Sequence, residues 1–317
     1  MAQGTLPVDL LLNSMDIRAA LKEGIARLRA ANTPSHTLAA EILLIHALGH
    51  DRTWLYTHPE VILDSAAAKK YFALVDRRAS GEPTQYLTGK QEFWGLEFEV
   101  TPDVLIPRPE TEHVVEVALE RLGPRGIKIN LHTGAPNPRL RIADVGTGSG
   151  CLAVALAREL PHAEIFATDS SAPALAVAKR NAAGHNVADR IHFEQADLLA
   201  NHLHESRITT SESRLFDLIV SNPPYVAGNV ADQLPREVRD HEPGLALFPG
   251  PTGLEIYARL IEQAVSLLRS GGILVLELGH DSANHVRGIF AEQASWTKLS
   301  LTNDLAGIPR VIAAERR

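Results

Sequence analysis

Cysteine is almost absent from this sequence of 317 residues, which contains only Cys151. A single cysteine excludes an intramolecular disulfide framework and is typical of a protein from a reducing compartment. The 14 histidines are scattered, and none has the Cys/His spacing of a zinc site. We therefore expect no structural metal. We also expect Cys151 to be a small buried residue rather than a reactive thiol.

Long hydrophobic runs are absent as well. No apolar segment is long enough to span a bilayer, and residues 8–12 are too short for the core of a signal peptide. Residues 1–14 resemble a loose leader and lack the dense arginine and serine content of a transit peptide. These features predict a cytoplasmic protein with no membrane partner.

The sequence also lacks an excess of basic residues. Its 31 Lys and Arg face 38 Asp and Glu, which gives a formal net charge of −7. Proteins that bind nucleic acid through its phosphates usually have a basic surface, so this balance argues against a direct nucleic-acid partner. Hydrophobic residues make up 45% and charged residues 22%, as in ordinary globular proteins, and the length allows two domains.

The first part of the chain has a helical pattern. Apolar residues recur at helical spacing, with Pro34 and Ser35 as the start of one helix and Gly49 as its end. Ser65 is in a position to cap a third helix. We expect residues 15–90 to form a small helical domain.

The composition then changes. Residues 92–106 are dense in aromatic and apolar side chains, and Gly95 and Pro102 interrupt them, which predicts a β-hairpin. We assign residues 91–108 to a hairpin linker and residues 110–122 to an amphipathic helix.

Residues 109–317 form the second predicted domain, in which strands and helices alternate from residue 140 onward. This alternation predicts an α/β fold with an open, mostly parallel sheet covered by helices. The expected strands are 141–145, 164–168, 191–194, 216–221 and 273–278. The expected helices are 151–159, 173–183, 254–268 and 282–291. Residues 296–301 and 308–314 should form a final antiparallel pair, and residues 123–140 and 201–214 should be exposed insertions.

A glycine-rich turn follows the first of these strands. Gly146, Gly148 and Gly150 alternate with Thr147 and Ser149 between a predicted strand and a predicted helix. Glycines at such a turn let the backbone bend tightly and let a ligand approach closely. The spacing differs from the dinucleotide fingerprint, and no Lys-Ser/Thr ending makes it a P-loop. The turn therefore indicates a nucleotide or nucleoside site of another kind.

Polar residues end the next two strands. Asp169 is placed to accept hydrogen bonds from both hydroxyls of a ribose, and it is also placed to cap the following helix. Asp197 and Leu198 follow the third strand and could contact the edge and the face of an adenine ring. Because carboxyl ends of parallel strands share one edge of the sheet, these residues predict one nucleoside pocket.

The sharpest motif is Asn222-Pro223-Pro224-Tyr225, directly after an apolar strand. The two prolines stiffen the loop and remove two backbone donors, which leaves carbonyl oxygens to face outward. Asn222 adds a side-chain carbonyl oxygen, and Tyr225 adds a flat face. This set of acceptors suits a planar –NH₂ group, and the residues leave open whether that group belongs to glutamine or to adenine.

The chemistry of methyl transfer to an amide explains such a loop. An amide nitrogen is a weak nucleophile because its lone pair is delocalised into the carbonyl group. Two acceptors that hold both N–H groups aim the nitrogen and favour the charge that develops on it during attack. No strong base is needed before attack, because the methylated cation is far more acidic than the amide. A sulfonium methyl donor is already activated, so no metal is needed.

With these residues in view, the chain resembles the HemK/PrmC family of release factor glutamine methyltransferases over residues 17 to 312. The resemblance is carried by Leu87-Thr88-Gly89, Glu92-Phe93-Trp94-Gly95, Ile106-Pro107-Arg108-Pro109-Glu110-Thr111-Glu112, Gly146-Thr147-Gly148-Ser149-Gly150 and Ser221-Asn222-Pro223-Pro224-Tyr225. The Pro-Arg-Pro-Glu-Thr-Glu string is more selective than the Asn-Pro-Pro-Tyr loop, which adenine-methylating enzymes share. Glu242-Pro243 and Ala246-Leu247 also look like the segment that follows this loop in the family.

The resemblance implies a seven-stranded, mostly parallel, Rossmann-like methyltransferase sheet, a small N-terminal helical domain that docks the substrate, and a linking hairpin. It implies S-adenosyl-L-methionine as cofactor and S-adenosyl-L-homocysteine as product. The substrate would be the side-chain amide of the glutamine in the Gly-Gly-Gln loop of peptide chain release factors, which act in translation termination. We expect the enzyme to be a monomer.

The resemblance also assigns roles to residues of this sequence. The cofactor contacts would be Gly146, Thr147, Gly148, Ser149, Gly150, Asp169, Leu198 and Asn222, and the strand-end pattern adds Asp197. The residues Asn222, Pro223, Pro224 and Tyr225 would hold the glutamine, with Asn222, Pro223 and Tyr225 as catalytic residues. Leu198 departs from the family, which often has a bulky aromatic residue there.

Three alternatives remain open at this stage. An adenine amino-methyltransferase acting on DNA could use the same loop, but it needs a target-recognition region and a basic surface. A glutamine methyltransferase acting on a ribosomal protein is a closer relative, and the Pro-Arg-Pro-Glu-Thr-Glu string argues against it. A non-catalytic S-adenosylmethionine-binding protein would not need an intact Asn-Pro-Pro-Tyr loop. Arg108 and Glu110 either shape the pocket or attach the hairpin to the following helix.

Overall fold

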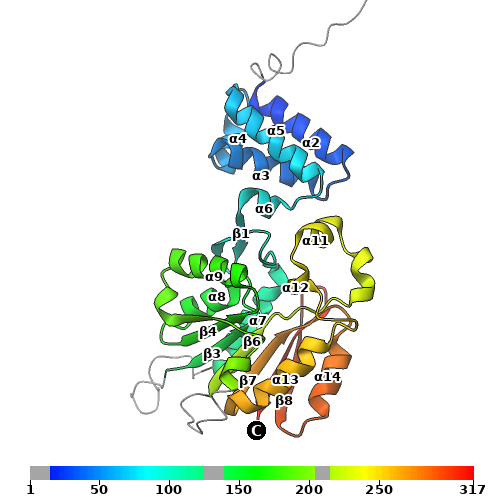
Figure 1. The fold of residues 1–317 in the computed structure, drawn as a ribbon. Coiled ribbons are helices and arrows are strands. Elements are labelled where there is room, and N and C mark those ends of the chain that lie inside the picture. Colours follow the sequence, from blue (N-terminus) through cyan, green and yellow to red (C-terminus); the bar gives the residue numbers. More distant parts are fainter. Residues whose placement is uncertain (1–14, 124–138, 204–214) are drawn as a thin grey trace, which may run out of the picture. The chain divides into compact units, whose positions relative to one another are not determined.

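The computed structural model describes residues 15–123, 139–203 and 215–317, and the chain divides into two compact units (Figure 1). The first unit comprises Met1–Gly89 and Pro235–His241, and the second comprises Lys90–Leu234 and Glu242–Arg317. The leader expected at residues 1–14, most of the insertion at 123–140 and most of that at 201–214 lie outside the described residues. Among the described residues, no helix is long and apolar enough to cross a membrane.

The first unit is helical. Its helices are α2 (Ile17–Ala30), α3 (His36–Leu48), α4 (Arg52–Thr57), α5 (Ser65–Ala79), α6 (Thr84–Thr88) and α11 (Arg236–His241). Helix α5 is capped by Asp64, which accepts hydrogen bonds from the backbone N–H groups of Ala66 and Ala67 at 2.8 Å, and not by Ser65. A carboxylate placed before the helix reaches these two unpaired N–H groups, whereas Ser65 already lies inside the first turn.

The core of the first unit depends on one close approach. Tyr71 of α5 is fully buried, and a Cβ atom at Gly24 of α2 would lie 1.9 Å from its hydroxyl oxygen. Only glycine therefore lets α2 pack on this ring. Leu28, Leu43 and Val75 complete the buried centre.

The second unit begins with a hairpin. Strand β1 (Lys90–Phe93) pairs with β2 (Leu96–Glu99) in antiparallel register. Trp94 and Gly95 connect them, both with positive φ (56° and 68°), which matches the twist of a two-residue hairpin turn. Phe93 and Phe98 are buried and their rings meet edge to face, so the hairpin contributes to the main core.

A seven-stranded sheet forms the centre of the second unit, with the strand order β5-β4-β3-β6-β7-β9-β8. The strands are β3 (Arg141–Val145), β4 (Glu164–Asp169), β5 (Ile191–Gln195), β6 (Phe216–Ser221), β7 (Leu268–Glu277), β8 (Trp296–Asn303) and β9 (Pro309–Arg316). Strands β3 to β7 run parallel, and β9 and β8 are antiparallel additions. The predicted α/β sheet with a final antiparallel pair is therefore confirmed.

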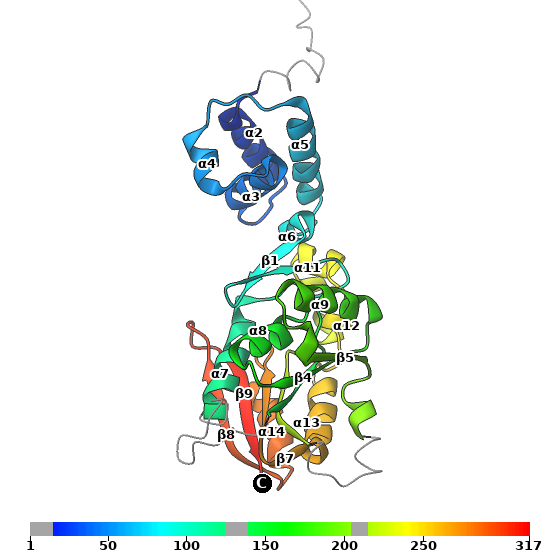
Figure 2. The same cartoon turned by 90° about the vertical axis from the view of Figure 1, so that its left-hand side faces the viewer.

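Helices cover both faces of this sheet (Figures 1 and 2). The helices of one face are α7 (Glu112–Leu122), α8 (Cys151–Glu159) and α9 (Ala172–Gly184), and those of the other are α13 (Glu255–Leu267) and α14 (Ala283–Ala291). The shorter elements are η1 (Pro109–Thr111), η3 (Ala188–Arg190), η5 (Gly228–Gln233) and α12 (Gly244–Leu247). Side chains of successive strand residues alternate between the two cores, as Ile273 and Leu274 do.

Strand β7 starts earlier than the sequence predicts. Leu268 already pairs with Phe216, and a register shift separates this pair from the regular ladder that begins at Ile273. Gly271 has φ +73° within the shift. The sequence predicts a helix that ends at residue 268 and a strand that starts at residue 273. The segment between them instead belongs to the strand and forms a bulge, where Gly271 tolerates the positive φ.

The outer strand β8 is irregular. Its pairing with β9 shifts between Thr297 and Ser300 and again between Thr302 and Asn303. Lys298, inside the first shift, has φ +48° and forms an ion pair with Glu315 of β9 at 3.0 Å. The edge of the sheet is therefore bent and carries a charge.

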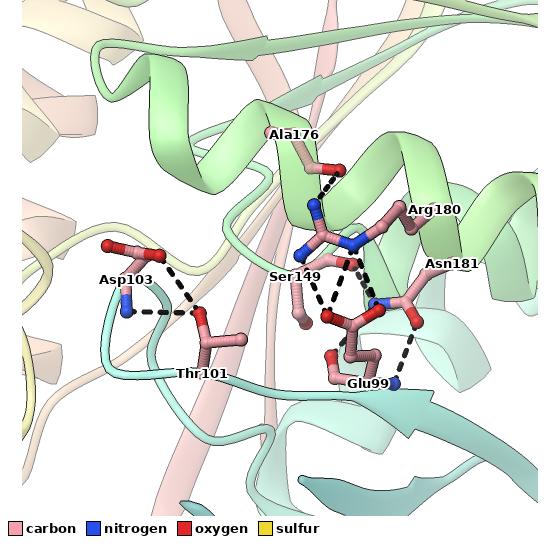
Figure 3. Close-up of polar contacts among 7 residues, drawn as sticks. All are labelled: Glu99, Thr101, Asp103, Ser149, Ala176, Arg180 and Asn181. Atoms are coloured by element: carbon pink, nitrogen blue, oxygen red, sulfur yellow. Dashed lines mark hydrogen bonds and ion pairs between the residues drawn. The ribbon is translucent and has the colours of Figure 1, made fainter.

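One buried side chain ties the hairpin to the sheet domain (Figure 3). Asn181 of α9 accepts a hydrogen bond from the backbone N–H of Glu99 at 2.7 Å. Its Nδ2 donates to the carbonyl oxygens of Glu99 at 3.0 Å and Ser149 at 2.8 Å. The neighbouring Arg180 forms a two-pronged ion pair with the Glu99 carboxylate, but both side chains are half exposed. One amide thus fixes the end of the hairpin and the end of the glycine turn.

We predict that Asn181→Ala lowers the free energy of unfolding by about 2–4 kcal/mol, because it leaves one buried and two partly buried backbone groups without partners. Arg180→Ala is the matched control, and it should cost less than about 1 kcal/mol because an exposed ion pair contributes little. Urea denaturation of both variants measures the difference. Equal losses would mean that Asn181 has no special role in this attachment.

Candidate active site

A pocket of about 290 Å³ lies at the carboxyl edge of the parallel strands in the second unit. Its lining comes from residues 103–105, Pro107, Thr111, 145–149, Cys151, Leu152, 169–171, Ala174, 196–198, 221–224, Pro243, Leu245, Ala246, Phe248, Pro249 and Ile256. Residues after β3, β4, β5 and β6 thus meet in one cavity, as expected for an open α/β sheet.

The glycine turn lines this pocket. Gly146 and Gly148 line it and have φ values of +72° and +54°. A Cβ atom at either position would meet nothing within 4 Å, so the turn faces open space on the side where a ligand could approach. Gly150 does not line the pocket, and a Cβ atom there would lie 3.1 Å from Cβ of Ala178 in α9. Gly150 instead lies where the start of α8 packs against α9.

A carboxylate beneath the turn was not assigned a role from the sequence. Asp144 is fully buried, and its Oδ2 accepts hydrogen bonds from the Thr147 hydroxyl at 2.6 Å and the Ala153 backbone N–H at 3.0 Å. It therefore holds the turn to the start of α8. Burial raises the pKa of Asp144 to about 7, although both hydrogen bonds act to lower it. The sequence feature that could have revealed Asp144 is the presence of a charged residue inside an apolar strand.

Asp169 lines the pocket, at the strand end where the sequence places it. Its Oδ2 accepts a hydrogen bond from the Gly148 backbone N–H, and its Oδ1 accepts one from that of Ser171, both at 2.9 Å. Each carboxylate oxygen can accept a further hydrogen bond. The N-cap of α9 is Ser171 rather than Asp169. Asp169 therefore connects the glycine turn to the next strand end while keeping capacity for a ligand.

Asp197 and Leu198 both line the pocket. Asp197 is largely exposed and forms an ion pair with Arg259 of α13 at 2.5 Å. The sequence pattern did not reveal Arg259, which lies 62 residues further along the chain. Leu198 has φ +53°, a strained value for a residue with a branched side chain.

The Asn-Pro-Pro-Tyr loop divides between the pocket and the core. Asn222, Pro223 and Pro224 line the pocket, whereas Tyr225 does not. Nδ2 of Asn222 donates a hydrogen bond to the hydroxyl oxygen of Thr111 at 3.1 Å. Thr111 belongs to the Pro-Glu-Thr-Glu string and also lines the pocket, so the two most specific motifs of the sequence are in direct contact.

Tyr225 packs behind the loop. Its ring lies so close to Gly279 that a Cβ atom there would approach it to 2.6 Å. Its hydroxyl donates to Oε1 of Glu277 at 3.3 Å. Burial raises the pKa of Tyr225, so the hydroxyl stays protonated at any ordinary pH.

Glu277 ends β7 as a buried carboxyl group that the sequence did not single out. Burial raises its pKa to about 7, and hydrogen bonds from Thr111 and Tyr225 act to lower it. The sequence feature that could have revealed Glu277 is its position as an acidic residue at the end of an apolar strand. His280, three residues further along the chain, is exposed and pairs with Asp281.

Arg108 binds a buried acid rather than the pocket. Its guanidinium pairs with Oε1 of Glu242, whose Oε2 accepts a hydrogen bond from the Ile106 backbone N–H at 3.3 Å. Neither Arg108 nor Glu110 lines the pocket. Arg108 therefore attaches the segment after the hairpin to the segment that carries Glu242.

Cys151 is buried, and burial raises its pKa to about 12, so the thiol is not an activated nucleophile. Within the described ranges, no group of three or more His, Cys, Asp or Glu residues could hold a metal ion.

Two family models match the sequence. The PrmC N-terminal domain matches residues 19–89, and the methyltransferase small domain matches residues 127–237. The chain is also similar to curated proteins named release factor glutamine methyltransferase. The protein from Koribacter versatilis is 41% identical over 95% of this chain and 99% of its own length. The one from Chlorobaculum tepidum is 44% identical over 85% of this chain and 87% of its own length.

A solved structure has a similar fold. The hMettl16 catalytic domain, in complex with the MAT2A 3'UTR hairpin 6, aligns with a TM-score of 0.53 and 20% identity. The alignment covers 76% of this chain and 81% of that one. At this identity the likeness concerns the fold alone.

The buried Asp144 makes stability depend on pH. Its pKa rises from an ordinary 3.8 to about 7, so the folded protein keeps a proton that the unfolded chain loses above about pH 4. The corresponding stabilisation is present below pH 3.8 and is lost as the pH rises through about 7. We predict that Asp144→Asn reduces this loss by roughly 2–4 kcal/mol between about pH 4 and pH 8.

Urea denaturation at a series of pH values measures the effect. The wild-type free energy of unfolding should fall more steeply with rising pH than that of the variant. The variant should keep the smaller slope that the buried Glu277 contributes. Parallel slopes for the two proteins would contradict a neutral, buried Asp144.

Proposed function

The chain belongs to the family of release factor glutamine methyltransferases, and on this premise we propose that it transfers a methyl group from S-adenosyl-L-methionine to a glutamine side-chain amide of a peptide chain release factor. The acceptor would be the glutamine of the Gly-Gly-Gln loop. The observation that carries this proposal is the contact between Asn222 and Thr111, because it joins the amide-binding loop to the string that is most selective for the family.

The pocket has features that fit this cofactor. The turn at Gly146 and Gly148 opens toward the cavity, which lets a ligand approach the backbone closely. The carboxylate of Asp169 keeps acceptor capacity for ribose hydroxyls. Asp197 and Leu198 line the same pocket and would contact the base. We assign cofactor contacts to these residues, to Thr147 and Ser149 of the turn, and to Asn222, and we assign Gly150 to helix packing.

The loop after β6 would hold the substrate amide. Pro223 and Pro224 line the pocket and have no backbone N–H, so their backbone offers carbonyl acceptors without competing donors. When bound, S-adenosyl-L-methionine supplies an electrophilic methyl group on a positively charged sulfur. The acceptors of Asn222 and Pro223 would fix the two N–H groups of the glutamine and direct the nitrogen lone pair. No group in the loop needs to act as a strong base.

We assign the docking of the release factor to the helical first unit. Large apolar side chains are exposed on it, including Leu38 and Ile42, which are four residues apart on α3. We further propose a cytoplasmic monomer without a direct nucleic-acid partner. The single free cysteine and the net charge of −7 support this assignment.

A labelling experiment tests the substrate. We expect label from S-adenosyl-L-methionine to appear on a release factor, and not on the same factor with its Gly-Gly-Gln glutamine replaced. Duplex DNA and ribosomal proteins, incubated in parallel, should stay unlabelled. Transfer to DNA, or equal transfer to the altered factor, would overturn the proposal.

The role of Asn222 gives a second prediction. Asn222→Ala should lower kcat by on the order of 10²–10³-fold, because one of the oriented acceptors is lost. Cofactor affinity, measured by calorimetry, should change little. Asn303→Ala on the exposed edge strand β8 is the matched control and should behave like the wild type. A folded Asn222→Ala protein that no longer binds the cofactor would show that its main role is cofactor binding.

A further inference from the structure

One large apolar side chain of the pocket lining is exposed. Leu245 of α12 lines the pocket, yet 75% of its surface is accessible. None of the other large apolar side chains that are exposed in the described part of the chain lines this pocket. A single exposed leucine is ordinary on a protein surface, so its position beside a binding site is the informative feature.

The backbone that carries Leu245 is well defined. Helix α12 (Gly244–Leu247) is a single turn, in which the Ala246 N–H donates to the Pro243 carbonyl oxygen at 2.9 Å. The Phe248 N–H donates to the Gly244 carbonyl oxygen at 2.9 Å and closes the turn. Because the backbone is already ordered, a partner that covers Leu245 loses little free energy to ordering it.

This helical turn is attached to the substrate loop. Val226, the residue directly after the Asn-Pro-Pro-Tyr loop, donates its N–H to the Leu247 carbonyl oxygen at 2.9 Å. The Gly228 N–H donates to the Gly250 carbonyl oxygen at 3.1 Å. Leu245 is therefore two residues away from a backbone contact with the end of the loop that would hold the substrate amide.

The other end of the turn is attached to the segment that follows the hairpin. Glu242, three residues before Leu245, is buried and accepts hydrogen bonds from the Arg108 guanidinium and from the Ile106 N–H. Removing one partner of a buried ion pair leaves a charge without compensation, so this attachment resists displacement. Arg108 belongs to the most selective motif of the sequence and thus holds the chain just before α12.

We propose that Leu245 packs against the peptide that flanks the acceptor glutamine, and that Arg108, through Glu242, holds it in place. The proposal rests on the proposed function, since the partner is the Gly-Gly-Gln loop of a release factor. The two glycines have no side chains, so a leucine can lie directly on their backbone. Leu245 is then a specificity-determining residue, and Arg108 is a positioning residue.

The charge of the pocket lining favours such a partner. The charged residues of the lining are Asp103, Asp169 and Asp197, and the described residues that line the pocket include no Lys, Arg or His. A nucleic acid would bring phosphates to these carboxylates without a base to neutralise them. A glycine-rich peptide carries no such charge and offers backbone surface that an exposed leucine can cover.

The first test measures steady-state kinetics of the full-length protein with a release factor as substrate. Leu245→Ala should raise KM for the factor by on the order of tenfold, because an apolar contact is lost. Its kcat should change little, since this contact exists before and during methyl transfer. Leu245→Met keeps the apolar volume and should behave like the wild type.

Two controls accompany this variant. Leu305→Ala, at a fully exposed leucine between β8 and β9, should leave KM unchanged. Affinity for S-adenosyl-L-methionine, measured by calorimetry, should be the same for Leu245→Ala and the wild type. An unchanged KM for the factor would overturn the proposal, and so would a loss of cofactor affinity, because the leucine would then cover the cofactor.

The second test changes the substrate. In a release factor whose glycine next to the glutamine is replaced by valine, the added side chain should meet Leu245. The loss of kcat/KM relative to the normal factor should therefore be smaller for Leu245→Ala than for the wild type. Any effect of the substitution on the factor itself is common to both enzymes and cancels in this comparison. Equal losses would place Leu245 away from the glycines.

The third test examines Arg108 in a double-mutant cycle. Arg108→Ala should raise KM for the factor, but it should add little when Leu245 is already alanine, because it acts through that side chain. Glu242→Gln, which keeps an acceptor for the Ile106 N–H, replaces this variant if Arg108→Ala does not fold. Fully additive effects would rule out the positioning role.

The same measurements separate this inference from the proposed function. If the wild type transfers no methyl group to any release factor, the substrate assignment is wrong. If the wild type is active and Leu245→Ala has the same KM, the assignment holds and the role of Leu245 is wrong.

Discussion

The parallel pairing of β3 with β4 on one side and β6 on the other is the constraint on which the candidate site depends. Val145, the last residue of β3, is in register with Thr168 and with Ser221. The chain moves outward to β5 after β4 and then returns to the other side of β3, so strand order reverses at this point. Loops on the two sides of such a reversal part from each other and leave a crevice. A shift of one residue in either pairing would turn Asp144 out of its buried place and would misplace both the glycine turn and the asparagine loop.

Much of the fold could be predicted because its signals are local. A strand buried on both faces is a short apolar run, and a helix repeats its apolar residues every three to four positions. Both patterns are visible in the sequence without knowledge of any partner. The ends of β3 and β6 are marked by Gly146 and by Asn222-Pro223, residues that change the backbone conformation abruptly. Helices α4 and α6, with six and five residues, are too short to show such a repeat and were not expected.

The sequence predicted part of the candidate site. The features that it did not predict all depend on contacts between residues that are far apart in the sequence. Strand ends indicate which residues reach the edge of the sheet, so Asp169, Leu198 and Asn222 could be placed there. The sequence does not indicate which distant side chain meets them. Thr111 lies 111 residues before Asn222, and Glu277 lies 52 residues after Tyr225. Tyr225 and Gly150 were counted with the pocket because they belong to its motifs, but the packing of Gly279 and Ala178 draws them away from it.

The irregular edge strand β8 has a consequence for the behaviour of the protein at high concentration. An exposed, regular edge offers a row of free backbone groups onto which another chain can add a strand, and such edges promote aggregation. Here the positive φ of Lys298 and the two register shifts interrupt that row. A strand that added to this edge would also remove water from the Lys298–Glu315 ion pair. The irregular pairing of β8 therefore disfavours aggregation through the edge of the sheet, including in the newly synthesised protein.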